Sequence, residues 1–165
     1  VMADVKERYF EGKTVVGLQI SAKKRVPKHH IPTFLRCAEF LSMGPDTRYY
    51  LATDDLDIRE VYRQNLGPLL IEVDYTKLNK FEVALIDMWL LGSSDKVVAS
   101  PGSIFGAIAY SRTRKVPYVV NKNNQCVRML TSQPCFHYNF DKFKLSCWDP
   151  KMLTTDMLNH EKCYG

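Results

Sequence analysis

Short apolar segments alternate with amphipathic segments along the chain as far as Val120. Runs of apolar residues bounded by turn residues predict strands, and apolar residues repeated every three to four positions predict helices. The predicted strands are Thr14–Ile20, Arg48–Thr53, Leu69–Val73, Lys96–Ser100 and Val116–Val120. The predicted helices are Ile31–Met43, Asp55–Asn65 (capped by Asp54), Phe81–Leu91 and Ile104–Arg112. This alternation predicts an α/β fold, a Rossmann-like doubly wound parallel sheet that helices cover on both faces.

The same topology predicts where a ligand binds. In doubly wound sheets the ligand lies beyond the carboxyl ends of the strands, at the point where the strand order reverses. We expect Thr14–Ile20 to be a central strand, so the segments that follow the strands are the candidate ligand contacts. These segments are residues 21–30, 53–55, 74–80 and 100–103.

Composition narrows the possible functions. The 165 residues are 45% hydrophobic and 25% charged, which is typical of a globular domain. The formal net charge of +5 suits an anionic ligand such as a nucleotide diphosphate, and no aromatic-rich basic stripe indicates a nucleic acid partner. The longest apolar run, residues 83–91, contains Asp87 and is too short to span a bilayer.

The periodic pattern fades after Val120 into a segment rich in Asn, Lys, Pro and Cys. We therefore predict a Rossmann-like domain over residues 1–121. A cysteine-containing extension over residues 122–165 is expected to pack on it.

Cysteine usage is uneven. Cys126, Cys135, Cys147 and Cys163 fall in the extension, whereas Cys37 stands alone in the first half. We predict that these four cysteines form two disulfides with one another, in any of three pairings, and that Cys37 is buried and free. Disulfides would indicate a secretory compartment, and four free thiols would indicate a reducing cytosol. No Cys or His spacing typical of zinc is present, so no metal site is expected.

The segment Ser100–Gly106 joins a predicted strand to a predicted helix and carries small residues. Gly102 would let a ligand approach the backbone closely, and Ser103 can cap the helix while the amides of residues 103–105 point outward. Such a helix N-terminus favours an anion. The alternative interpretation is a tight turn with a capping serine.

Acidic residues near the strand ends could contact a nucleoside. Asp87 lies in a strongly apolar predicted helix, so its carboxylate needs donors. The adjacent N–H groups of guanine would supply them, and an ion pair with an Arg or Lys is the alternative. Asp55 and Asp57 form a D-x-D pattern, but acidic residues are favoured in the first turn of a helix without any metal. Asp54 could reach a ribose or base.

A basic run, Ser21–His30, follows the first predicted strand and faces the expected ligand crevice. Its cations could neutralise a diphosphate, although a solvated basic loop would look the same. Two adjacent histidines, at positions 29 and 30, are candidate general bases. The cations of the run are Lys23, Lys24, Arg25 and Lys28.

Three motifs, in order, resemble the plant xyloglucan-type (galactoside 2-alpha-L-) fucosyltransferases. They are "VVGLQIS", "ALIDMWLLGSSDKVVASPGSIFGAIAY" and "CVRMLTSQPCFH" followed by Cys147, and the resemblance runs from about Lys13 to Cys163. It implies the C-terminal, donor-binding half of a two-domain GT-B enzyme in the Golgi lumen. It also implies GDP-fucose as donor, transfer of L-fucose with inversion to a galactose hydroxyl of a cell-wall or glycoprotein glycan, and no required metal or other cofactor. The glycan acceptor and any membrane anchor would involve parts outside this chain.

The resemblance also assigns residues. Ser103, Ile104 and Phe105 match a family segment that contacts the nucleotide, and Asp87 falls at an acidic position that more distant fucosyltransferases use for guanosine. The family has an arginine on the β-phosphate where this chain has Ser21, so we expect Arg25, or else Lys24, to replace it as the catalytic cation. The expected donor-nucleotide-binding residues are Gln19, Ser21, Thr53, Asp54, Asp87, Ser100, Gly102, Ser103, Ile104 and Phe105.

The serine at position 21 leaves a second interpretation open. Without a cation that replaces the arginine, the chain would be a catalytically weak or inactive relative that binds a sugar nucleotide or glycan. A transferase for another donor sugar is a third possibility, because a segment such as Ser103–Phe105 would hold any diphosphate.

Overall fold

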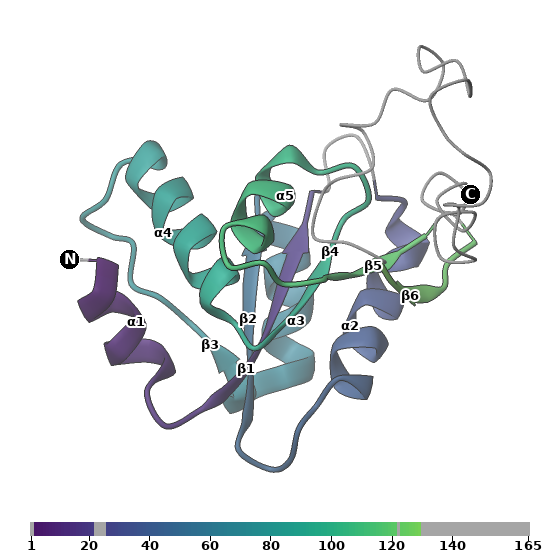
Figure 1. Ribbon diagram of the computed structural model, residues 1–165, viewed down its shortest axis with the longest axis horizontal. Helices are drawn as coiled ribbons and strands as arrows, with labels where there is room; N and C mark the ends of the chain where they lie inside the picture. Colours follow the sequence, from purple (N-terminus) through teal and green to yellow (C-terminus); the bar gives the residue numbers. More distant parts are fainter. Residues whose placement is uncertain (1, 22–25, 122, 130–165) are drawn as a thin grey trace, which may run out of the picture.

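The structure is a computed structural model that describes residues 2–21, 26–121 and 123–129 (Figure 1). Helices and strands alternate through most of this part of the chain. The strands are β1 (Thr14–Ile20), β2 (Thr47–Thr53), β3 (Leu70–Ile71), β4 (Lys96–Ala99), β5 (Tyr118–Val120) and β6 (Cys126–Arg128). The helices are α1 (Met2–Phe10), α2 (Ile31–Phe40), α3 (Leu56–Leu66), α4 (Lys80–Ser93) and α5 (Ile104–Ser111), with short 3₁₀ turns η1 (Lys28–His30) and η2 (Gly67–Leu69).

The described strands form one sheet in the order β3-β2-β1-β4-β5-β6. The first five are parallel to their neighbours, and β6 pairs antiparallel with β5 at the edge. The chain winds outward from β1 to β3, then returns to the other side of β1 to form β4. The strand order therefore reverses between β1 and β4, which confirms the predicted Rossmann-like topology and the central place of β1.

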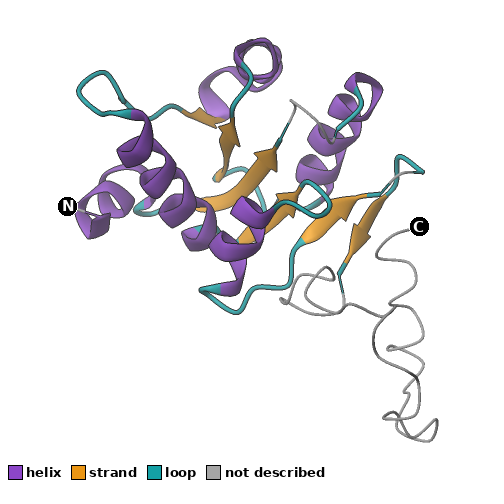
Figure 2. Cartoon of the chain, turned by 90° about the horizontal axis from the view of Figure 1, so that it is seen from above, coloured by secondary structure: helices purple, strands orange, loops and turns teal. Residues whose placement is uncertain are grey.

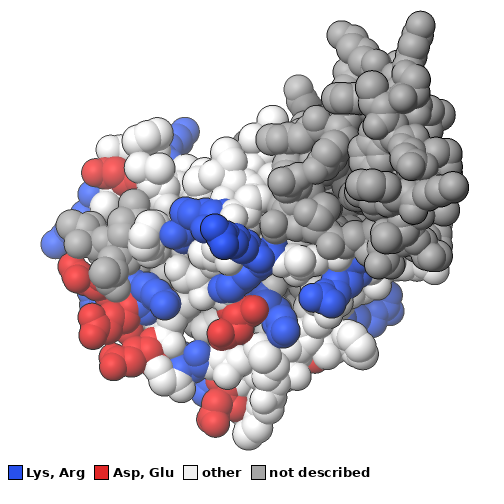
Figure 3. Space-filling view, in the orientation of Figure 1, with Lys and Arg blue, Asp and Glu red and all other residues white. Residues whose placement is uncertain are grey.

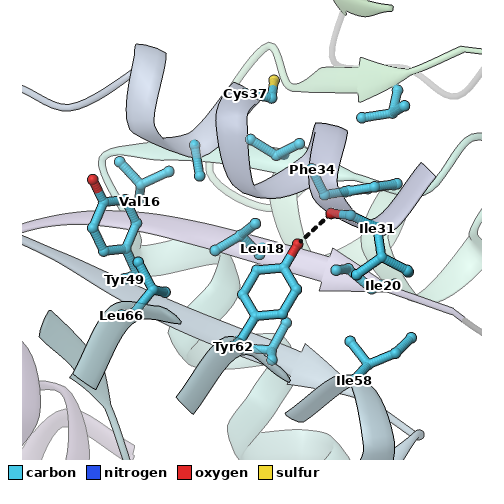
Figure 4. Close-up of a cluster of buried hydrophobic side chains, with 14 of the residues drawn as sticks. Val16, Leu18, Ile20, Ile31, Phe34, Cys37, Tyr49, Ile58, Tyr62 and Leu66 are labelled. Atoms are coloured by element: carbon cyan, nitrogen blue, oxygen red, sulfur yellow. Dashed lines mark hydrogen bonds between the residues drawn. The ribbon is translucent and has the colours of Figure 1, made fainter. Parts of the chain in front are cut away.

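Helices cover both faces of the sheet (Figure 2). On one face, α2 and α3 pack on side chains that alternate along β1, including Val16, Leu18 and Ile20. On this face Tyr62 of α3 is fully buried, and its hydroxyl donates a hydrogen bond of 3.1 Å to the Ile31 carbonyl of α2 (Figure 4). On the other face, α1, α4 and α5 pack on residues such as Val15, Tyr50 and Val97.

The predicted elements exist, with changes at their ends. The cap of α3 is Asp55 and not Asp54, because the Asp55 carboxylate accepts the amides of Asp57 and Ile58 at 2.9 and 3.2 Å. The strand β6 was not predicted. A turn allows it: the side chain of Asn121 accepts the Gln125 amide at 3.0 Å and folds the chain back along β5.

The disulfide prediction was wrong for Cys37 and Cys126. Cys37 is buried, as expected, but it is bonded to Cys126, with the two Cα atoms 5.6 Å apart. The reason is the unpredicted strand: β6 lies against α2, and this contact brings Cys126 over the buried face of the helix. Cys135, Cys147 and Cys163 lie outside the described residues, as does the predicted extension beyond Met129.

In the part of the chain that the structure describes, no helix is both long and apolar enough to cross a membrane.

Candidate functional site

The ends of three parallel strands meet at one edge of the sheet. Ile20, the last residue of β1, is paired with Thr53 of β2, and Gln19 is paired with Ala99 of β4. Residues that follow these pairs therefore stand side by side at the carboxyl edge. This edge includes the reversal of strand order between β1 and β4, where doubly wound sheets bind their ligands.

Ser100 ties the ends of β1 and β4 together. Its amide donates to the Gln19 carbonyl at 3.0 Å and to Gln19 Oε1 at 3.2 Å. Its hydroxyl donates to the Gln19 carbonyl at 3.1 Å and accepts the Ser21 amide at 3.0 Å. Gln19 and Ser100 are buried, so this network fixes the ends of β1 and β4 against each other.

The turn that follows β4 aims the start of α5 at the same place. Gly102 has a positive φ of 63°, a conformation that a side chain disfavours, and it places Ser103 as the N-cap. The Ser103 side chain accepts the Gly106 amide at 3.2 Å. The amides of Ile104 and Phe105 lie in the first turn of α5, where an α-helix provides no acceptor for them. They are thus suited to bind an anion.

Gly106 lets α5 approach the end of β1 closely. A Cβ at this position would lie 2.9 Å from Gln19 Oε1, so only glycine leaves the glutamine in its present place. Gly106, the last residue of the predicted phosphate-binding segment, therefore allows the close contact between α5 and β1.

Asp87 is buried in α4, and two tyrosine hydroxyls bond its carboxylate. Its Oδ1 accepts a hydrogen bond of 2.5 Å from the Tyr50 hydroxyl and a second one from Tyr75. Burial raises the pKa of the Asp87 carboxyl, while the two hydroxyls and the charge of Arg59 offset part of the rise. Burial also raises the pKa of both tyrosines, which remain donors.

This cluster stands apart from the ends of β1 and β4. Tyr50 lies three residues before the end of β2, which corresponds to about 10 Å along the strand. Asp87 reaches the sheet from the face that α4 covers. Neither tyrosine was predicted as a site residue, because no local pattern marks a tyrosine in a strand or a loop as the partner of a distant carboxylate.

The end of β2 contributes polar groups beside the end of β1. Thr53 Oγ1 accepts the Asp55 amide at 3.3 Å. Asp54 follows directly after Thr53. Asp55 and Asp57 of the D-x-D pattern are arranged as a helix cap and a first-turn residue. Among the described residues, no group of three or more His, Cys, Asp or Glu side chains is placed to hold a metal ion.

The basic run is described only in part. The predicted catalytic residues Lys24 and Arg25 lie outside the described residues, and so does Lys23. His30 is buried next to exposed His29, with the ring centroids 4.4 Å apart. Burial lowers the pKa of His30, and His29 adds to the effect, so the surroundings favour its neutral form.

The structure therefore brings most of the predicted nucleotide-binding residues to one edge and leaves Asp87 below it. The residues gathered at the edge are Gln19, Ser21, Thr53, Asp54, Ser100, Gly102, Ser103, Ile104 and Phe105. A strand-end floor next to a helix N-terminus is an arrangement that can hold a diphosphate.

No protein-family model matches the chain, and no curated protein matches it in sequence. Solved structures do match in fold. A mutant of Arabidopsis thaliana FUT1 in complex with GDP aligns with a TM-score of 0.60 and 17% identity, over 81% of this chain and 38% of that one. NodZ alpha-1,6-fucosyltransferase soaked with GDP-fucose aligns with a TM-score of 0.59 and 18% identity, over 77% of this chain and 46% of that one.

Fucosyltransferase NodZ from Bradyrhizobium gives a similar result, with a TM-score of 0.57 and 20% identity, over 77% of this chain and 44% of that one. The chain thus spans less than half the length of these structures. The likeness confirms the predicted fold class: the chain has an α/β fold with a mostly parallel sheet that it shares with part of these fucosyltransferases.

Proposed function

We propose that this chain is the donor-binding domain of a fucosyltransferase. It would hold GDP-fucose while L-fucose is transferred, with inversion, to a galactose hydroxyl of a cell-wall polysaccharide or glycoprotein glycan. The acceptor would be bound by a second half that is not part of this chain. The observation that carries the proposal is that Gln19 and Ser100 join the ends of β1 and β4 next to the N-terminus of α5. The fold around this point is shared with fucosyltransferases that were solved with GDP or GDP-fucose.

The diphosphate is proposed to lie against the first turn of α5. There the amides of Ile104 and Phe105 and the positive end of the helix dipole would meet its oxygens. Gly102 leaves room for this approach. Because the amides are held by the backbone, they need no rearrangement when charge grows on the leaving GDP.

The nucleoside is proposed to extend towards β2. Thr53 and Asp54 stand at the end of that strand and offer polar groups to a ribose or base. For Asp87 to bind guanine as well, the base would have to reach the cluster of Asp87, Tyr50 and Tyr75 and take the place of a tyrosine hydroxyl on the carboxylate.

Stabilisation of the leaving group is proposed to come from the basic run after β1. Ser21 offers a backbone amide that Ser100 already accepts and a neutral hydroxyl, so it cannot replace a guanidinium. Arg25, or else Lys24, would supply the charge. We propose that the reaction needs no metal or other cofactor, since fixed amides and a cation can stabilise the diphosphate between them.

A Golgi-lumen location is part of the proposal, with any membrane anchor outside this chain. The Cys37–Cys126 disulfide supports it, because such bonds persist in oxidising compartments.

A second candidate function follows from Ser21. If no cation from the basic run reaches the diphosphate, the same crevice would bind a sugar nucleotide without efficient transfer. Loss of one stabilising group of this kind typically costs about 10²–10³ in rate.

A pair of matched variants tests the donor site. Ile104 and Ile108 lie one turn apart on the exposed face of α5, 58% and 50% exposed. Ile104→Glu places a carboxylate in the proposed diphosphate site, and we expect at least about 10-fold weaker GDP binding by calorimetry, as for like charges brought close together. Ile108→Glu should bind GDP as the unmodified protein does. Equal affinities in the two variants would contradict the site.

A donor panel tests the proposed substrate. GDP-fucose, GDP-mannose and UDP-galactose should each be titrated separately into the unmodified chain, and GDP-fucose should bind most tightly. If the three donors bind with equal affinity, the site is a general diphosphate site and the assignment of fucose as the donor sugar is contradicted. In the two-domain protein, GDP affinity without turnover would support the second candidate function.

A further inference from the structure

The side chain of Gln19 is held in one orientation near the end of β1. Its Oε1 accepts the Ser100 amide at 3.2 Å. A backbone N–H can only donate, so the oxygen of the carboxamide faces Ser100 and the nitrogen, Nε2, points away from it. Gln19 therefore offers an oriented NH₂ group on the side away from Ser100.

This NH₂ group has no acceptor in the part of the chain that the structure describes. Gln19 is only 4% exposed, and its Nε2 donates no hydrogen bond to a described residue. Among the described residues, the side-chain atoms that are both unpartnered and sealed from solvent belong to Trp89 and Asn124. Gln19 Nε2 is not one of them, so a bound molecule can reach it. A buried donor without a partner calls for an acceptor from outside the fold.

The carboxamide lies against the first turn of α5. A Cβ placed on Gly106 would be 2.9 Å from Gln19 Oε1 and 3.4 Å from Gln19 Cδ, the atom that carries Nε2. Side chains alternate along a strand, so Gln19 is on the same face of β1 as Val15, which packs beneath α4 and α5. The free donor thus stands at the start of α5, where the amides of Ile104 and Phe105 have no acceptor within the helix.

The donors gathered at this point are neutral N–H groups. Helix α5 carries no charged residue, and the surface over it is white in Figure 3. Backbone and carboxamide N–H groups at the positive end of a helix dipole favour a negatively charged oxygen. A cation would find no acceptor among them. The chemistry that fits is therefore an anion with several oxygens that can accept hydrogen bonds side by side.

We propose that Gln19 Nε2 donates a hydrogen bond to a diphosphate oxygen of the bound nucleotide, beside the amides of Ile104 and Phe105. This role rests on the proposed donor site and adds to it a side-chain donor that is independent of the basic run. Gln19 then has two tasks: Oε1 holds the end of β4, and Nε2 holds the ligand. Hydrogen bonds to a charged acceptor are stronger than neutral ones, so the loss of this contact is measurable.

The change Gln19→Glu separates the two tasks. A carboxylate of the same shape still accepts the Ser100 amide, but it places an oxygen where Nε2 now donates and repels a diphosphate. We expect at least about 10-fold weaker GDP binding by calorimetry, the scale for a lost hydrogen bond to a charged group. The matched control, Gln64→Glu, makes the same change at an exposed position near the end of α3 and should leave GDP binding unchanged. Full affinity in Gln19→Glu, or an equal loss in the control, would overturn the proposal.

Nuclear magnetic resonance of the unmodified chain gives a readout that does not depend on how a variant folds. The side-chain NH₂ resonances of Gln19 should shift on saturation with GDP and should stay in place with guanosine, which has no phosphate. No shift with GDP would contradict the contact. An equal shift with guanosine would assign the contact to the nucleoside and would also overturn the proposal.

The α5 variants distinguish a failure of this role from a failure of the proposed function. If Ile104→Glu weakens GDP binding and Gln19→Glu does not, the donor site stands and the role of Gln19 is contradicted. If the unmodified chain does not bind GDP, both are contradicted.

Discussion

Asp87 shows what a single residue in a sequence does and does not reveal. Its apolar flanking residues predicted a buried carboxylate that needs donors, and the structure has this arrangement. The identity of the donors could not be predicted. Tyr50 is 37 residues away and Tyr75 lies in a loop without periodicity, so only the packing of α4 on β2 brings the three side chains together.

The buried carboxylate makes stability depend on pH. Burial raises the pKa of Asp87 above its ordinary value of 3.8, so the folded state holds the proton more tightly than the unfolded state. The unfolding free energy contributed by this group should therefore fall as pH rises from 3.8 through the folded-state pKa. Asp87→Asn should remove this fall. Denaturant unfolding of both proteins from acidic to neutral pH measures it, and parallel pH profiles would contradict it.

Tyr75→Phe provides a second check on the same cluster. It removes one donor to the ionised carboxylate, so the pKa of Asp87 should rise further. The loss of stability should then extend to higher pH than in the unmodified protein. A profile that moves to lower pH would show that the hydroxyl of Tyr75 does not stabilise the charged form.

At the scale of elements, two glycines set how closely helices can approach. Gly92 of α4 packs on α5, where an added Cβ would lie 2.4 Å from the Ala109 carbonyl oxygen. Gly106 of α5 packs on β1, where an added Cβ would lie 2.9 Å from the flexible end of Gln19. Backbone cannot move away cheaply, whereas a side chain can. The two positions should therefore respond differently to the same change.

Gly92→Ala should lower the unfolding free energy by about 1–3 kcal/mol, the usual cost of overpacking. Gly106→Ala should cost little stability, because alanine favours the helix and Gln19 can rotate. It should nevertheless weaken GDP binding, since Gln19 would leave the network with Ser100. Unfolding curves and GDP titrations separate the two effects. Equal destabilisation by both variants would show that Gln19 has no room to rotate.

The elements themselves were largely predictable, because strands and helices alternate with strong apolar periodicity. The prediction failed where tertiary contacts decide which residues form an element or cap it. The edge strand β6 has only three residues and forms because β5 offers a free edge. The choice of Asp55 over Asp54 as the cap of α3 depends on backbone geometry that two adjacent aspartates do not reveal.

At the scale of the whole molecule, the Cys37–Cys126 disulfide joins α2 to the edge of the sheet across 89 residues. Spacing alone suggested pairing among the four late cysteines, because sequence does not show which one returns to the first half. Such a long closed loop should stabilise the fold by about 2–4 kcal/mol. Cys126→Ser, or reduction, should lower the unfolding free energy by that amount. An unchanged midpoint on reduction would contradict a structural role for this bond.

The proposed catalytic activity depends on whether a cation compensates for the neutral Ser21 at the end of β1. The sequence resemblance predicts an arginine at the position of Ser21, and the Ser21 amide is already bonded to Ser100. If a cation from the same run has taken over, Arg25→Ala should lower turnover of GDP-fucose by about 10²-fold in the two-domain protein. Arg128→Ala, an exposed arginine on β6, is the matched control and should leave turnover unchanged.

Ser21→Arg is the converse change. It places a guanidinium at the end of β1, and a guanidinium can bind a phosphate through a bidentate contact. Turnover should rise if the site lacks only this charge, and the rise should be largest when Arg25 is absent, because the two cations would serve the same phosphate. A response to Arg25→Ala alone would place the charge entirely in the basic run. No response to either change would mean that the diphosphate does not lie at the end of β1, and the donor-site proposal would then have to be abandoned.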